Sequence, residues 1–110
     1  MSDGRCELRL TRRYAASPGE VWRALTDPDS VARWLAPPPG VEWQAVEPER
    51  VLELAWHPEG EEPSVVRVEL RAEGGGTTLV LEHRQIVATL GMRYVRIWTA
   101  RLAAFEEALR

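Results

Sequence analysis

Residues 15–37 read AASPGEVWRALTDPDSVARWLAP and predict two short amphipathic helices in succession. Ser17 is suited to cap the first helix, with Pro18 at its first position and Glu20 three residues after the cap. Asp27-Pro28 ends this helix and begins the second, which the proline-rich segment 37–40 stops. Six apolar residues recur at helical spacing: Val21, Trp22, Leu25, Val31, Trp34 and Leu35.

The segments around the helix pair alternate between apolar and polar residues, which is typical of antiparallel strands with one dry face. We predict strands at 6–14, 41–46, 51–57, 64–72 and 77–84, with a tight hairpin at Gly74-Gly75-Gly76. A long helix is predicted at 87–109, because apolar residues, with Gly91 among them, recur every three or four positions. We therefore expect one two-layer α+β domain over residues 1–110, in which the long helix covers the dry face of the sheet.

Composition excludes several classes of function. The 110 residues are 45% hydrophobic and carry a net charge of −3, which argues against non-specific nucleic-acid binding. No apolar run approaches the roughly 20 residues of a membrane helix, and the first residues hold no apolar signal segment, so we expect a cytoplasmic protein. Cys6, His57 and His83 lack the spacing of metal ligands, and we predict neither a metal nor a cofactor.

Four segments carry a resemblance to a known family. They are TRRYAASPGEVWRALTDPDSVARWLAP (11–37), VEPERVLELAWHPEG (46–60), VRVELRAEGGGTTLVLEH (66–83) and WTARLAAFEEAL (98–109). In sequence and in order they resemble the START-like, or SRPBCC, superfamily, which has the helix-grip fold of the Bet v 1 type. The most similar branch is the AHSA type, bacterial domains related to the heat-shock ATPase activator. The resemblance implies a curved antiparallel sheet that grips an apolar ligand against the C-terminal helix.

The chain departs from this family in length. Family members carry an extra hairpin between the second short helix and the strand before the turn at 47–50. The resemblance then implies five strands rather than seven, in the order first, fifth, fourth, third, second, with both edges open. Open edges are either protected by charge or paired with another strand. Arg9, Arg13, Glu42 and Glu47 could supply the charge, or a second copy could pair with an edge to form a homodimer.

The uneven charge leaves the same two interpretations open. Residues 42–62 hold seven Glu and only Arg50 as a basic residue, whereas residues 5–14 hold four Arg and only Glu7 as an acidic one. The two segments are either solvated faces or an acidic edge that meets the basic edge of another subunit.

By resemblance, one set of residues lines the ligand groove, although large aromatic residues fill cores as readily as they line pockets. The set comprises Arg12, Trp22, Leu25, Trp34, Leu35, Trp43, Leu54, Trp56, Val68, Leu81, His83, Tyr94, Trp98 and Leu102. Arg12 and His83 share the phase of inward apolar residues and could orient an apolar ligand. Alternatively, Arg12 extends to water and His83 is an ordinary histidine at the rim.

The leading hypothesis for function is non-catalytic binding of a small apolar molecule. The alternative is a protein-interaction module, either co-chaperone-like or self-associating. A second alternative is a cyclase- or dehydratase-like enzyme, for which Arg12, His83 and Tyr94 would have to converge on one cavity. The sequence holds no Ser-His-Asp spacing and no phosphate-binding loop, so we name no catalytic residue.

Overall fold

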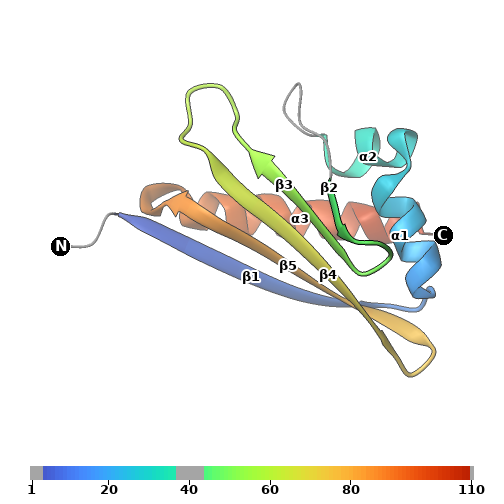
Figure 1. Cartoon of the computed structure of the whole chain (residues 1–110). Helices are drawn as coiled ribbons and strands as arrows, with labels where there is room; N and C mark the ends of the chain where they lie inside the picture. Colours follow the sequence, from blue (N-terminus) through green and yellow to red (C-terminus); the bar gives the residue numbers. More distant parts are fainter. Residues whose placement is uncertain (1–3, 37–43, 110) are drawn as a thin grey trace.

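The computed structural model describes residues 4–36 and 44–109 and has the predicted α+β helix-grip architecture (Figure 1). In chain order its elements are β1 (Arg5–Tyr14), α1 (Pro18–Thr26), α2 (Pro28–Trp34), β2 (Gln44–Glu47), β3 (Val51–Trp56), β4 (Ser64–Glu73), β5 (Gly76–Val87), a 3₁₀ turn (Ala88–Leu90) and α3 (Gly91–Ala108). The described strands form one antiparallel sheet in the order β1-β5-β4-β3-β2, as predicted. Helix α3 runs along one face of the sheet, while α1 and α2 gather at one end, near the C-terminus (Figure 1).

The helix pair forms as its sequence predicts. The Ser17 side chain accepts a hydrogen bond from the Glu20 amide at 3.3 Å, and Asp27 accepts one from the Ser30 amide at 3.1 Å. A proline follows each cap at the first helical position, where its missing amide hydrogen is not needed. The apolar stripe of each helix faces inward. α1 buries Val21 and Leu25, and the end of α2 buries Trp34 and Leu35.

Two predicted boundaries near the C-terminus are wrong. Strand β5 continues to Val87, because its last residues still pair with the start of β1 and Ile86 is buried. Helix α3 therefore begins at Gly91 rather than at 87. A methyl group at Gly91 would lie 3.0 Å from the Cys6 sulfur, so the small residue allows the start of α3 to lie close to β1. Of the strand predicted at 41–46, residues 44–46 belong to β2 and residues 41–43 lie outside the described part of the chain.

The core lies between α3 and the dry face of the sheet. Tyr94, Trp98, Leu102 and Phe105 form the buried stripe of α3. On the sheet, every second residue of β4 is buried along most of the strand, as expected for a sheet covered on one side. The Tyr14 hydroxyl donates to the main-chain carbonyl of Leu102 at 3.2 Å and so joins β1 to the middle of α3.

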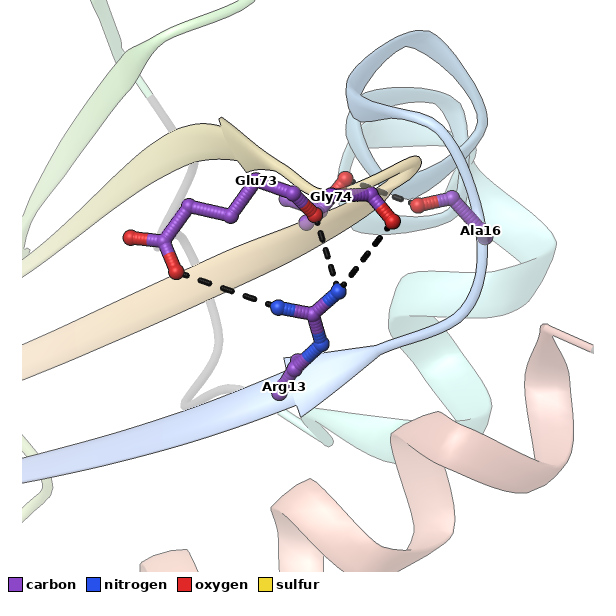
Figure 2. A network of polar contacts seen from close by, with 5 residues as sticks. Arg13, Ala16, Glu73 and Gly74 are labelled. Carbon is purple, nitrogen blue, oxygen red and sulfur yellow. Dashed lines mark hydrogen bonds and ion pairs between the residues drawn. The ribbon is translucent and has the colours of Figure 1, made fainter.

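The end of the sheet beside the helix pair is tied together by Arg13 (Figure 2). Gly74 and Gly75 adopt φ angles of 53° and 83°, which a two-residue hairpin turn of this hand requires. The Arg13 guanidinium donates to the carbonyls of Glu73 and Gly74 at 2.9 and 3.4 Å and lies 3.8 Å from the Glu73 carboxylate. Thr77 donates to the Ala16 carbonyl at 2.8 Å. β1 is thereby joined across β5 to the β4–β5 turn.

This close approach makes Gly76 a sensitive position. A methyl group there would lie 2.5 Å from the Tyr14 carbonyl oxygen, so the main chain would have to shift. We expect Gly76→Ala to lower the free energy of unfolding by about 1–3 kcal/mol, measured by urea titration. The matched control is Gly19→Ala in α1, where the added methyl meets open space and should leave stability unchanged or slightly higher. Equal stability of the two variants would contradict the packing described here.

Candidate functional site

Most residues predicted to line a groove are buried in the core. Eleven of the fourteen have at most 3% of their surface exposed: Leu25, Trp34, Leu35, Leu54, Trp56, Val68, Leu81, His83, Tyr94, Trp98 and Leu102. Trp22 is half-buried and packs against the margin of this core. Trp43 lies outside the described residues. The side chains of these eleven buried residues therefore lie in the core.

The two ends of this core differ in chemistry. Beside the helix pair, the Phe105 ring packs edge-on against Trp34 and Tyr14, with centroid distances of 5.0 and 5.4 Å. At the other end, Trp56, Ser64, His83, Tyr94 and Trp98 combine aromatic rings with hydrogen-bonding groups, and we call these five residues the His83 cluster. Binding sites typically combine apolar walls with a few convergent polar groups, so the His83 cluster is the better candidate.

His83 is fully buried on β5 and both of its ring nitrogens are engaged. Trp98 donates its indole hydrogen to Nδ1 at 3.0 Å, so Nδ1 carries no proton. Nε2 lies 2.7 Å from the Ser64 hydroxyl, which itself donates to the Trp56 carbonyl at 3.0 Å. The serine oxygen must therefore accept from Nε2–H, and the network specifies a neutral imidazole with its proton on Nε2. Burial acts in the same direction and lowers the pKa of His83 to about 4.

Tyr94 forms the outer part of the cluster. Its hydroxyl accepts from the Trp56 indole nitrogen at 3.0 Å and donates to the carboxylate of Glu61, in the loop between β3 and β4. Burial and the hydrogen bond to Glu61 raise the pKa of Tyr94 to about 12. Glu61 thus ties the β3–β4 loop to the helix, while Trp56 is held both through its indole nitrogen and through its carbonyl.

Arg12 does not join this cluster. In the pairing of β1 with β5, Leu8 lies opposite His83, whereas Arg12 lies opposite Leu79, four residues further along. Its guanidinium donates to the adjacent Thr11 carbonyl at 2.9 Å. Tyr94 and His83 do meet, with ring centroids 4.6 Å apart. The convergence of Arg12, His83 and Tyr94 that the enzymatic alternative required is therefore absent.

The sequence reading missed Ser64 and Glu61. Ser64 lies in phase with Val66 and Val68 on β4, so its inward position could have been read from the alternation. Glu61 lies in an irregular loop, where no periodicity indicates which side chain turns inward. Arg101 was also missed, although it follows Trp98 by three residues, a helical spacing that places it near the buried stripe.

The described residues offer little support for other classes of site. Within residues 4–36 and 44–109, no group of three or more His, Cys, Asp or Glu side chains could hold a metal ion. In the same part of the chain, no helix is both long enough and apolar enough to cross a membrane. Half of the residues that line a surface hollow beside α1 and α2 are charged, namely Glu20, Arg23, Asp27 and Arg33.

Comparison with known proteins identifies the family. The model of the family described as Activator of Hsp90 ATPase homolog 1-like protein matches residues 38–110. Because this match covers more than half of the chain, the protein belongs to that family, within the SRPBCC-type fold that the sequence resembles. The matched region begins after the helix pair, so the membership is carried by the sheet from β2 onward and by α3. No curated protein matches the sequence.

Solved structures extend the likeness over the helix pair. The crystal structure of CalU16 from Micromonospora echinospora is 28% identical, with a TM-score of 0.82, and the match covers 96% of this chain and 76% of CalU16. MLL2253 from Mesorhizobium loti is 24% identical, with a TM-score of 0.80, over 94% of this chain and 96% of that one. DynU16, from the dynemicin biosynthetic locus, is 22% identical, with a TM-score of 0.80, over 98% of this chain and 48% of DynU16. These last two likenesses concern the fold.

The neutral state of His83 makes stability depend on pH. The unfolded chain binds a proton at this residue below about pH 6.5, whereas the folded protein binds it only below about pH 4. The contribution of His83 is thus complete above pH 6.5 and is lost as the pH falls toward 4. Between pH 7.5 and pH 5, urea unfolding should show a loss of about 2 kcal/mol from this residue.

Two variants isolate this effect from the titration of carboxylates. His83→Gln should lose less stability than the wild type over the same pH interval, because its amide does not titrate. His57→Gln, at an exposed position, should retain the wild-type pH dependence. If all three proteins lost stability equally, His83 would not be held neutral by the fold.

Proposed function

We propose that the protein binds a small, largely apolar molecule at the outer margin of the His83 cluster, between α3 and the β3–β4 side of the sheet. The observation that carries this proposal is the gathering of indole, phenol and imidazole groups at one end of an otherwise apolar core. The fold supports it, because the helix-grip architecture is consistent with ligand binding. Stacked aromatic faces supply contact area, and the Tyr94 hydroxyl supplies a polar group that can orient the bound molecule.

Access would depend on the β3–β4 loop. Glu61 lies in this loop, and its carboxylate accepts the hydrogen bond from Tyr94 at the outer side of the cluster. A molecule that reaches the Tyr94 hydroxyl must replace this carboxylate. Binding would then be opposed by the free energy of the Glu61–Tyr94 hydrogen bond, which is of order 1.5–3 kcal/mol for a charged acceptor.

A neutral aromatic probe tests the proposal directly. N-phenyl-1-naphthylamine has roughly 17 non-hydrogen atoms, which at about 0.3 kcal/mol each predicts a Kd of about 200 µM or tighter. We expect saturable enhancement of its fluorescence, with energy transfer from Trp56 and Trp98. The absence of a saturable signal with the wild type and with the loop variant Glu61→Ala would refute the proposal.

The loop variants provide a matched comparison. Glu61→Ala removes the carboxylate that Tyr94 holds, so the affinity for the neutral probe should rise by about ten- to a hundredfold. Glu62→Ala removes the same charge from the adjacent exposed position and should leave the affinity unchanged. Equal behaviour of the two variants would show that Glu61 does not control access.

Self-association through β1 is a second proposal, favoured by the ten-residue length of this edge strand. In an antiparallel pair of β1 strands centred on Leu8, Glu7 of one copy would lie opposite Arg9 of the other. We expect light scattering to detect dimers at concentrations up to about 1 mM, and Arg9→Glu to weaken them by placing like charges together. A strict monomer throughout would remove this proposal.

A further inference from the structure

Arg101 is a cationic side chain that contacts the proposed binding site. It extends from α3, and the central carbon of its guanidinium lies 5.6 Å from the Trp56 ring centroid and 5.7 Å from that of Trp98. Both distances are typical of a cation held over an aromatic face. Since both indoles belong to the His83 cluster, the guanidinium lies directly against the cluster.

One nitrogen of this guanidinium is buried without a hydrogen-bond partner. Nη1 is shielded from solvent and makes no hydrogen bond within the described structure. Several other arginines pair with glutamates, as in Arg67 with Glu53 and Arg71 with Glu69, but no carboxylate of residues 4–36 and 44–109 forms an ion pair with Arg101. A buried N–H donor of a cation is costly to leave unsatisfied, and an indole face offers it no lone pair in the plane of the guanidinium.

We propose that Arg101 binds the anionic group of the ligand, so that the molecule accepted at the His83 cluster is an apolar acid with a carboxylate attached to a ring system. This inference rests on the proposed function and adds to it the charge of the ligand. A guanidinium presents paired donors that match the two oxygens of a carboxylate, and its contact with two indoles fixes where those donors point. The ring system of the ligand would pack on the aromatic margin beside it.

The position of Glu61 is consistent with this assignment. The Trp56 indole contacts Tyr94 through its nitrogen and Arg101 through its ring face, so both groups adjoin one side chain. Tyr94 already donates to a carboxylate, that of Glu61. An incoming carboxylate can therefore replace Glu61 as the acceptor near Tyr94 and also satisfy Arg101, which Glu61 does not contact. The ligand would compensate for the hydrogen bond that it displaces.

Two probes with one skeleton test the inference. N-phenyl-1-naphthylamine is neutral, whereas 8-anilino-1-naphthalenesulfonate carries an added anionic group on the same rings. We expect the wild type to bind the anionic probe more tightly. Arg101→Gln should lower the affinity for the anionic probe by about tenfold or more and the affinity for the neutral probe by less than about threefold. Arg96→Gln, which removes the same charge from an exposed position of α3, should change neither affinity.

A measurement on the wild type alone keeps the test independent of variant folding. Raising the salt concentration from about 20 mM to about 500 mM should reduce the preference for the anionic probe, because screening acts on the charged contact and not on the aromatic one. An equal effect of Arg101→Gln on both probes, or a wild type without preference, overturns the role of Arg101 while the proposed function stands. Failure of both probes to bind either the wild type or Glu61→Ala overturns the proposed function and this inference with it.

Discussion

The structure depends on the packing of α3 against the one dry face of an open five-stranded sheet. An antiparallel sheet of this kind is stable only if its apolar face is covered, and the buried stripe from Tyr94 to Phe105 runs along it. The contact is fixed at two places along β1: Tyr14 bonds to the Leu102 carbonyl, and Cys6 lies against Gly91. The proposed binding site lies at the end of the core where polar groups interrupt this packing.

Those polar groups form two chains of hydrogen bonds that meet at Trp56. One runs from the Trp98 indole through His83 and Ser64 to the Trp56 carbonyl, and the other runs from the Trp56 indole through Tyr94 to Glu61. Because every donor in the two chains of hydrogen bonds has an acceptor, the network fixes Trp56 both at its indole nitrogen and at its main-chain carbonyl. A fixed aromatic surface is a better binding platform than a mobile one, since less side-chain entropy is lost when a ligand packs on it.

Much of this architecture could be predicted from local chemistry. The caps at Ser17 and Asp27, the alternation of β4 and the glycine turn each depend on neighbouring residues, and each formed as predicted. The predicted boundary between β5 and α3 was wrong because the extended conformation of residues 85–87 depends on pairing with β1, which lies some 80 residues away in sequence. The inward phase of Arg12 was predicted correctly from the alternation along β1. Its distance from His83 was not, because the register between strands is a tertiary property.

The contact of Arg101 with two indoles explains why its charge can persist beside a core without an ion pair. The ring faces stabilise the cation electrostatically, yet they satisfy none of the directional requirements of its N–H groups. A lysine at this position would leave fewer fixed donors, because its ammonium rotates freely and is strongly hydrated. Burial lowers the pKa of Arg101, and the same exclusion of water strengthens the attraction between its guanidinium and an adjacent anion. In the proposed complex, the same aromatic packing that holds the guanidinium would favour an acceptor that brings both a negative charge and an apolar skeleton.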